Sequence, residues 1–450
     1  MDSMRVGIIG AGATGLTAAL RLSGRHDVAL FEKGGPGGLG GIAGAVPIRG
    51  TWIDKFYHHI FTNDEHLVRL IDELGLGGEM LWKPAKNGLY LGSRLYPFTN
   101  PVDLILFPKV SLAGRLRMGF TVLGAKNIRD YSEMETVSAK EWLVKKAGRS
   151  AYETLWKPLL HSKFDEDADD VSGVWIWNKF KLRGSTRKGV NKEYLGYMRG
   201  GFIRLYRKMA EGMDIRYEAA TRIAPKGGKL LVATAKGEEL FDKVLFTGAA
   251  ELLGGLCELP GGYRERLMAQ KHKANICMTL VLRKPVSGYY WITVAEEGAP
   301  FVLMIEHTNL FGDPAYGGDS IVYLSRYLDA SDPLFVAGDG AIREAFLGYL
   351  GKMFPAFDAR DVLGCYVHRE RHAQPVVFQR HSERVLPLRT PVDGLYLANM
   401  GQIYPEDRGQ SHAVRLGEDA ARAMEEDAAR DAEGKGGAAP AAGADAGGGR

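Results

Sequence analysis

Three glycines near the start of the chain have the spacing of a phosphate-binding turn. Gly10, Gly12 and Gly15 stand in GAGATG, directly after the apolar run 5–9. Gly10 allows a tight turn, Gly12 lets the backbone approach a pyrophosphate, and Gly15 lets the following helix pack closely on the strand. Free amides at a helix N-terminus attract anions. We therefore expect a dinucleotide to bind here, with Ala13 at the helix start among its contacts.

An acidic residue ends the next apolar segment. DVALFEK reaches Glu32 at about 20 residues beyond the first glycine, where a dinucleotide-binding turn requires a carboxylate. A carboxylate there accepts hydrogen bonds from the adenosine ribose and repels a 2′-phosphate. Lys33 follows directly and is assigned to the same site. The order of strand, glycine turn, helix and strand predicts an α/β unit of the Rossmann type.

A second glycine cluster follows the acid, in EKGGPGGLGGIAG. The acid with a following Gly-Gly pair resembles the start of the superfamily of amine oxidases, protoporphyrinogen oxidases, phytoene desaturases and UDP-galactopyranose mutases. The resemblance implies FAD as the cofactor. Gly40 and Gly41 are the preferred match to the pair and are assigned to cofactor binding, while Gly37 and Gly38 are the alternative.

Three later segments extend the resemblance over most of residues 4–424. TWIDKFYHHIFTNDEHLVRLIDELG is similar to a segment beside the flavin, LGYMRGGFIRLYRKMA to a glycine-led helix, and DGLYLANMGQIYPEDRGQSHAVRLGEDAARAM to the C-terminal strand and helix. The last implies flavin contacts from Met400, Gly409 and Gln410, where the helix start stabilises charge on the reduced flavin. Asn399 and Met400 replace the Gly-Asp of many relatives, so the ribityl contact must be made differently.

These segments predict a discontinuous Rossmann-type FAD-binding domain with an inserted substrate domain of mixed α+β structure. A length of 450 residues accommodates two or three such units. The C-terminal tail is rich in Gly, Ala and Pro and is predicted to be disordered. The expected bounds are 1–80, 195–260 and 375–428 for the FAD-binding domain, 81–194 and 261–374 for the substrate domain, and 429–450 for the tail.

The catalytic residues are less sharply indicated. His58 and His59 are candidates from the second segment, although a histidine in such a place is as often a structural hydrogen-bonding group. NKFKLRGSTRKGVNK contains many basic residues and no acid, which predicts either an anion site or a solvated surface. Lys179 and Arg183 fall near the two arginines that flank the substrate pyrophosphate in UDP-galactopyranose mutases. Both are therefore assigned to substrate binding, and Arg183 is also a catalytic candidate.

The resemblance leaves more than one reaction class open. We expect an oxidoreductase that takes hydride from a bulky, apolar or anionic substrate onto flavin N5. A single dinucleotide fingerprint favours oxygen or a quinone as electron acceptor. The alternative is a mutase acting without net redox change on a sugar nucleotide, and a third possibility is a scaffold that holds FAD without turnover. Leu303 and Met304 stand where the mutases have a phosphate-binding arginine, which favours the oxidoreductase.

Composition excludes several other classes. Three cysteines without a CxxC pair predict neither a disulfide framework nor a metal site. A net charge of +4 gives no case for nucleic-acid binding. No signal peptide precedes the first strand and no apolar window is long enough to span a bilayer, so a cytoplasmic protein is expected. Residues 94–130 interleave apolar and basic side chains, which predicts either peripheral membrane contact or a helical substrate domain with a basic outer face.

Overall fold

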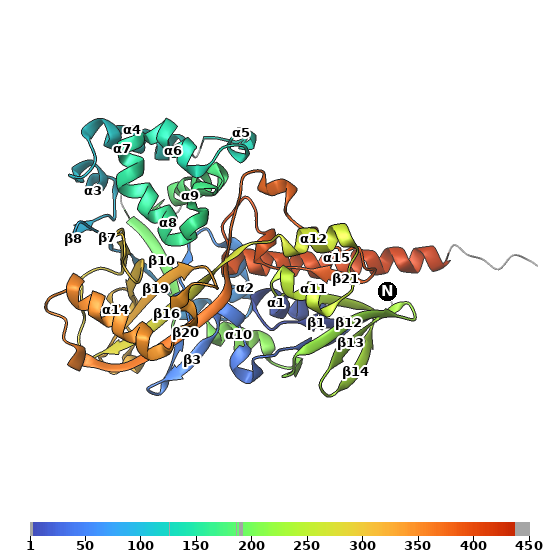
Figure 1. Cartoon of the computed structure of the whole chain (residues 1–450). Helices are drawn as coiled ribbons and strands as arrows, with labels where there is room; N and C mark the ends of the chain where they lie inside the picture. The colour runs from blue at the N-terminus through green and yellow to red at the C-terminus, as the bar shows by residue number, and fades with distance from the viewer. Residues whose placement is uncertain (1–2, 126, 186, 189–191, 437–450) are drawn as a thin grey trace, which may run out of the picture.

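The core of the first unit is a five-stranded parallel sheet assembled from distant parts of the chain (Figure 1). The computed structural model describes residues 3–125, 127–185, 187–188 and 192–436. Each strand of this sheet runs parallel to its neighbours, as the predicted Rossmann-type fold requires. The strand order across the sheet is β11 (Asp214–Arg216), β2 (Asp27–Phe31), β1 (Arg5–Ile9), β15 (Lys243–Phe246) and β21 (Leu395–Leu397).

Neighbouring residues of β1 pack into different cores because side chains alternate across a strand. Ile8 belongs to a cluster with four helices, whereas Ile9 packs with a β-meander and two short helices. The first set is α1 (Ala13–Leu22), α2 (Glu65–Glu73), α10 (Ile203–Ala210) and α15 (Gln410–Gly436). The second set is β12 (Ala220–Lys226), β13 (Lys229–Thr234), β14 (Gly237–Phe241), α11 (Ala250–Leu256) and α12 (Gly261–Met268).

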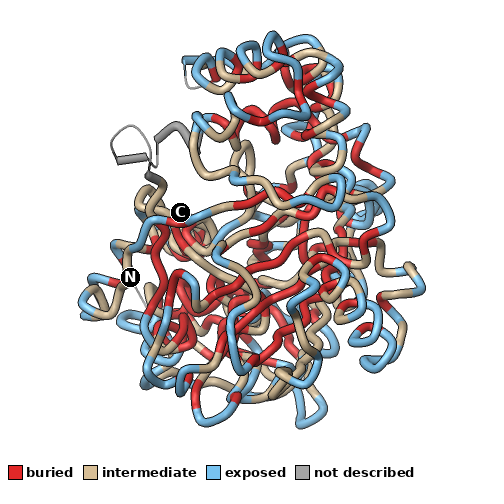
Figure 2. Tube along the Cα trace, turned by 90° about the vertical axis from the view of Figure 1, so that its left-hand side faces the viewer, coloured by how far each residue is buried: buried red, intermediate tan, exposed pale blue. Residues whose placement is uncertain are grey.

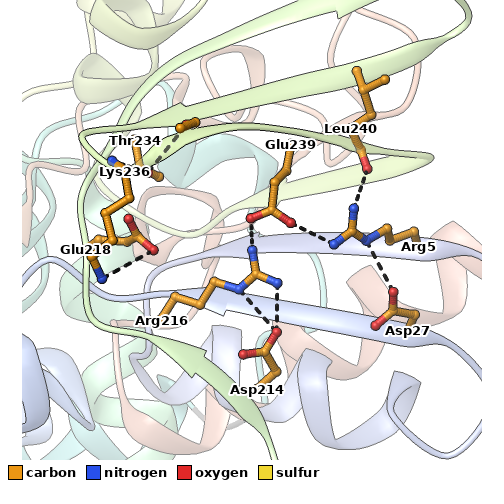
Figure 3. Close-up of polar contacts among 10 residues, drawn as sticks. Arg5, Asp27, Asp214, Arg216, Glu218, Thr234, Lys236, Glu239 and Leu240 are labelled. Carbon is orange, nitrogen blue, oxygen red and sulfur yellow. Dashed lines mark hydrogen bonds and ion pairs between the residues drawn. The ribbon is translucent and has the colours of Figure 1, made fainter.

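An ion network joins the meander to the edge of the parallel sheet (Figure 3). Glu239 of β14 accepts from Arg5 of β1, at 2.6 Å, and from Arg216 of β11. Arg5 also pairs with Asp27 at 3.2 Å, and Arg216 with Asp214 at 2.8 Å. These side chains are partly exposed, so each pair contributes about 1 kcal/mol or less. The ion network sets the position of the meander relative to the parallel sheet, while the apolar core that the two share stabilises their packing.

The second unit is built on a seven-stranded mixed sheet. The long strand next to one edge of this sheet pairs in antiparallel fashion with both of its neighbours. Helix α14 (Asp339–Met353) buries Ile342, Phe346 and Leu350 against the same sheet. The strand order is β20 (Val362–Pro375), β16 (His272–Leu282), β19 (Ser320–Leu328), β18 (Leu303–Glu306), β17 (Trp291–Val294), β7 (Asn87–Leu91) and β8 (Arg94–Pro97). The short helix α13 (Pro333–Val336) precedes α14.

A helical lobe stands beside this sheet (Figure 1). Its core packs Trp142, Trp177 and Phe180 together with other buried side chains. Its helices are α3 (Pro101–Leu106), α4 (Leu112–Ala125), α5 (Ser132–Glu135), α6 (Ala139–Ala147), α7 (Arg149–Ala151), α8 (Lys157–Phe164) and α9 (Gly173–Ser185). Among the residues that the structure describes, no helix has both the length and the apolar character needed to cross a bilayer.

Two smaller β elements link the units. A two-stranded ribbon leads into the segment that contains His58, and a small sheet pairs strands from both sides of the helical lobe. The ribbon is β3 (Ala45–Ile48) with β4 (Thr51–Asp54). The small sheet contains β5 (Ile60–Phe61), β10 (Lys192–Met198), β6 (Met80–Pro84) and β9 (Arg187–Lys188).

The structure differs from the sequence prediction at two boundaries. Helix α12 lies beyond the expected limit at 260, yet Leu267 packs with Val244 of the parallel sheet, so α12 belongs to the first unit. Helix α15 continues to Gly436, so residues 429–436 are helical and the prediction of disorder from 429 was wrong there. Asp431 holds this extension to the sheet through a 2.8 Å ion pair with Lys243. Residues 437–450 lie outside the described chain.

Candidate flavin and substrate site

The predicted phosphate-binding turn joins β1 to α1 closely. Gly10 has a φ of +109°, a conformation that favours glycine, and a Cβ atom on Gly15 would overlap the carbonyl oxygen of Gly10. A Cβ atom on Gly12 would meet no atom within 4 Å, so the backbone at Gly12 borders open space. Ala13 begins α1 and is buried. This arrangement fits the approach of a pyrophosphate to the N-terminus of α1.

The second glycine cluster reaches this turn through Gly40 and Gly41. The amide of Gly40 donates to the carbonyl oxygen of Ala11 at 2.9 Å, and a Cβ atom on Gly41 would lie 3.3 Å from Cα of Gly12. Both glycines have positive φ angles. The geometry therefore favours Gly40 and Gly41 as the pair beside the pyrophosphate.

The alternative pair, Gly37 and Gly38, lies beside the predicted ribose acid instead. A Cβ atom on Gly38 would overlap the carboxylate of Glu32. That carboxylate is buried and accepts hydrogen bonds from the amides of Ala11, at 2.9 Å, and Gly34, at 2.6 Å. These bonds fix its orientation at the end of β2, and its remaining lone pairs suit ribose hydroxyls. Lys33, the next residue, is exposed.

The start of α15 offers a buried donor to the same region. The Tyr206 hydroxyl donates to Oε1 of Gln410, which joins α10 to the first residue of α15. Nε2 of Gln410 is buried and has no hydrogen-bond partner among the described residues. Because an unpaired buried donor is costly, this amide fits contact with a bound group. Gly409 is exposed just before it.

Asn399 shows how the chain accommodates its departure from the superfamily pattern. Its side chain accepts from the amide of Gly401 at 2.9 Å and donates to the carbonyl oxygen of Gly248 at 2.9 Å. These bonds shape the turn that contains Met400, directly after β21. The residue that replaces glycine is thus a structural cap for this turn.

The two predicted histidines have different surroundings. Nδ1 of His59 lies 3.0 Å from the hydroxyl of Tyr290, and its ring also packs edge-on against Trp291. Nδ1 of His58 is buried without a hydrogen-bond partner in the described residues. Burial and, to a smaller extent, the charge of Arg408 together lower the pKa of His58 to about 4. His58 is therefore a neutral imidazole beside a fixed cation at neutral pH.

Arg408 belongs to a cationic cluster, defined here as Lys163, Lys179 and Arg408 around the carboxylate of Asp407. Nζ of Lys163 lies 3.0 Å and Nζ of Lys179 2.7 Å from Oδ2 of Asp407. Both ammonium groups also lie over the ring of Trp175, at 5.0 and 4.5 Å from its centroid. Two ammonium groups thus pair with one carboxylate, which also interacts electrostatically with the charge of Arg408, and this excess of positive charge suits a further anion.

Neighbouring polar side chains position Arg408. Its Nε donates to Oε1 of Gln374 at 2.9 Å, and its Nη2 donates to the hydroxyl of Tyr327 at 2.8 Å. The hydroxyls of Tyr327 and Tyr57 lie 3.1 Å apart. Strands β19 and β20, the segment before β5 and the loop before α15 therefore converge on one guanidinium.

Burial and charge compete at the centre of this cluster. Burial alone raises the pKa of Asp407, but the charges of Lys163, Lys179 and Arg408 hold it well below its usual range. Burial lowers the pKa of Lys163, which Asp407 partly opposes. Asp407 is therefore ionised throughout the neutral range.

The structure brings together one of the two predicted substrate residues with three that the sequence did not indicate. Lys179 lies in the cluster, while the side chain of Arg183 falls outside the described residues. Lys163, Asp407 and Arg408 were missed because no local motif marks them and they come from distant segments. The Asp-Arg pair directly before the predicted C-terminal helix was the one usable signal.

A family model for flavin containing amine oxidoreductase matches residues 13–424, which begin at the first residue of α1 and include the second glycine cluster, the cationic cluster and most of α15. The chain belongs to this family. Its cofactor is accordingly FAD, as the family resemblance implied, and the open backbone at Gly12 and the unpaired amide of Gln410 fit that cofactor.

Two curated proteins are similar in sequence to part of this chain. Protoporphyrinogen oxidase 2 of Arabidopsis thaliana is 25% identical over 197 residues, which are 41% of this chain and 38% of the relative. The mitochondrial protoporphyrinogen oxidase of Nicotiana tabacum is 28% identical over 205 residues, or 43% and 40% of the two chains. The matches therefore span about two fifths of the length of these relatives.

Several solved structures share the fold of this chain over nearly its whole length. A provisionally assigned protoporphyrinogen oxidase from Exiguobacterium sp. 255-15 has a TM-score of 0.78 at 19% identity, covering 95% of this chain and all of that chain. Reduced UDP-galactopyranose mutase has a TM-score of 0.74 at 16% identity, covering 94% and 96%. Cyclohexylamine oxidase from Brevibacterium oxydans IH-35A has a TM-score of 0.70 at 16% identity, covering 95% and 100%. These likenesses establish the fold.

Proposed function

We propose that this chain is an FAD-dependent oxidoreductase that takes hydride from a bulky substrate carrying an anionic group. The family supports the reaction class, and the cationic cluster supports the substrate class. FAD supplies the hydride acceptor at flavin N5. The chain's residues hold the cofactor, orient the reacting carbon and exclude water.

Residues of the glycine turn and α15 carry the cofactor in this proposal. Glu32 accepts from the adenosine ribose, Gly12 and Gly41 allow the backbone to approach the pyrophosphate, and Gln410 donates near the flavin. Ala13, Lys33, Met400 and Gly409 remain assigned to the same site by sequence position. Hydrogen bonds from the start of α15 favour negative charge on the reduced cofactor.

The cationic cluster orients the substrate. Lys163 and Lys179 offer ammonium donors, and Arg408 offers a guanidinium whose direction Tyr327 and Gln374 fix. Charge-assisted hydrogen bonds from such groups are stronger than neutral ones. His58 adds a neutral imidazole beside Arg408, and His59 is held by Tyr290, which supports positioning roles for both. Arg183 stays a candidate from the sequence.

A mutase acting on a sugar nucleotide is the competing proposal, because a cationic cluster would also suit a diphosphate. The segment that resembles the mutase arginine region argues against it. Leu303 is 5% exposed and Met304 is fully buried in an apolar cluster, so this part of β18 offers no cation. The neighbouring Glu306 accepts from the amides of Val286 and Ser287 at 2.7 Å, which supports a structural role for this segment.

Anaerobic reduction separates the two proposals. Candidate porphyrinogen, amine, polyprenoid and UDP-sugar substrates are added to the oxidised holoprotein without oxygen, and flavin absorption is recorded. An oxidoreductase loses its flavin absorption stoichiometrically with one substrate class. Interconversion of a UDP-sugar only after prior reduction, with no bleaching by any candidate, would instead establish the mutase. Oxygen and a quinone are then compared as acceptors by the rate at which each restores absorption.

A further inference from the structure

The outer side of α3 and α4 exposes an unusual amount of apolar surface. Seven of the twelve large apolar side chains that are exposed in the described residues lie in these two helices. Phe120 is 73% exposed and Leu106 70% exposed. We call this set the outer apolar face, which consists of Val102, Ile105, Leu106, Leu112, Leu116, Phe120 and Leu123.

Helix α4 is apolar on two opposite sides. One side is buried in the helical lobe through Gly114, Met118, Thr121 and Ala125. The other side repeats large apolar residues at helical spacing through Leu112, Leu116, Phe120 and Leu123. A surface helix ordinarily presents polar residues on its outer side. Contiguous apolar surface of this kind marks an interaction site.

Basic groups lie around the outer apolar face. Lys109 is exposed between α3 and α4, and Arg117 of α4 donates to the last carbonyl oxygens of α6, those of Lys145 at 2.7 Å and Lys146 at 3.1 Å. The side chains of Lys145 and Lys146 are themselves exposed. The end of α6 therefore adds two lysines to the rim of the face.

Acidic groups are scarce on the same face. Asp103 is the one acid between residues 101 and 129. Its carboxylate accepts from the amides of Thr99, at 2.7 Å, and Asn100, at 3.0 Å, and thereby caps the start of α3. The rim thus combines exposed cations with an acid that already serves the helix terminus. This charge distribution complements an anionic surface.

We propose that the outer apolar face docks on the surface of a bilayer that contains anionic phospholipids. Apolar side chains of two short helices enter the boundary between headgroups and acyl chains, and the basic rim contacts phosphate groups. A second copy of this chain is a poorer occupant, since matching faces would bring basic rims together. Figure 1 places α3 and α4 at the outer edge of the helical lobe, away from the parallel sheet, and Figure 2 shows exposed residues along that lobe.

Vesicle flotation of the full-length holoprotein tests the proposal independently of the reaction class. We expect it to float with phosphatidylcholine vesicles that contain phosphatidylglycerol, less with pure phosphatidylcholine, and less again at high salt. The double variant Leu106→Ser, Phe120→Ser should lose on the order of tenfold in bound fraction. Val336→Ser is the matched control, because Val336 is 71% exposed but lies on α13.

Two further experiments test the role of the basic rim and the possibility of self-association. The double variant Lys145→Glu, Lys146→Glu should weaken binding to the phosphatidylglycerol vesicles and leave flavin absorption unchanged. No flotation of the parent protein at low salt, or equal flotation of the Leu106→Ser, Phe120→Ser variant, would overturn the proposal. A lipid-free dimer that dissociates on Phe120→Ser, seen by analytical ultracentrifugation, would also overturn it and make a second copy the occupant.

Discussion

Nη2 of Arg408 donates to the hydroxyl of Tyr327 across 2.8 Å. This bond connects the loop that leads into α15 with strand β19 of the seven-stranded sheet. The units built on the parallel sheet and on the seven-stranded sheet thus share a hydrogen bond at the proposed substrate site. A cation fixed in this way loses little freedom when an anion binds, which favours affinity.

Arg408→Ala should weaken binding of an anionic substrate by about tenfold or more, because a charge-assisted hydrogen bond contributes about 1.5 to 3 kcal/mol. FAD content should not change. Titration of the flavin spectrum with substrate measures the dissociation constant. Arg422→Ala is the control, since Arg422 lies on the exposed side of α15 and pairs with Asp419. An equal loss of affinity for an uncharged substrate would contradict the assigned role.

Gly12→Val should lower FAD occupancy while the chain still folds. A Cβ atom at Gly12 meets no protein atom within 4 Å, so a valine should fit the fold there but block the approach of the pyrophosphate. Gly24→Val is the matched control, because a Cβ atom on Gly24 also meets nothing within 4 Å and this residue follows α1 at its far end. The ratio of flavin to protein absorbance measures occupancy. Equal occupancy of both variants would reject the pyrophosphate site.

Glu32→Ala should also reduce FAD occupancy, because it removes the acceptor proposed for the ribose and leaves the amides of Ala11 and Gly34 without their partner. Glu32→Gln keeps an acceptor oxygen and should bind FAD with an intermediate affinity. Titration of the apoprotein with FAD measures both effects. Full occupancy of Glu32→Ala would remove Glu32 from the site.

Asp407→Asn should destabilise the protein by about 3 kcal/mol, because three cations lose their carboxylate. The low pKa of Asp407 means that its stabilisation is present above the unfolded value near 3.8 and is lost as the pH falls through the folded value. The difference between variant and parent should therefore stay constant across the neutral range. Thermal unfolding with and without added sulfate tests this, since sulfate should restore part of the loss. Asp419→Asn, at an exposed pair, is the control.

Asp54 should make the protein less stable as the pH rises. Burial raises its pKa to about 8, although Tyr197 and the backbone of Phe202 oppose the change. Between the unfolded value near 3.8 and about 8, the folded state keeps a proton that the unfolded state releases. Stability therefore falls with pH, by up to about 1.4 kcal/mol per unit. Asp54→Asn should flatten the dependence of Tm on pH between 5.5 and 7.5, and an unchanged slope would count against the raised pKa.

The sequence was sufficient for features that depend on local order. Gly10, Gly12 and Gly15 follow one strand and precede one helix, so their spacing predicted the turn and a unit of the Rossmann type, while the family resemblance implied FAD. The cationic cluster was not predictable in the same way, because Lys163 and Arg408 are separated by most of the substrate unit and their contact depends on tertiary packing. The C-terminal extension was misjudged from composition because the pairing of Asp431 with Lys243 lies outside any sequence window.

The strand order of the parallel sheet has a consequence for synthesis on the ribosome. In this sheet β1 pairs with β15, and β15 pairs in turn with β21 near the end of the sequence. Helix α15 packs against α1 through Gly417, where a Cβ atom would overlap Thr14. The emerging N-terminal half therefore exposes apolar residues of α1 and β1 until the last segment leaves the exit tunnel. Contacts between such distant residues form slowly. The nascent chain should depend on chaperones until β21 and α15 have emerged, and it should acquire FAD only after that point.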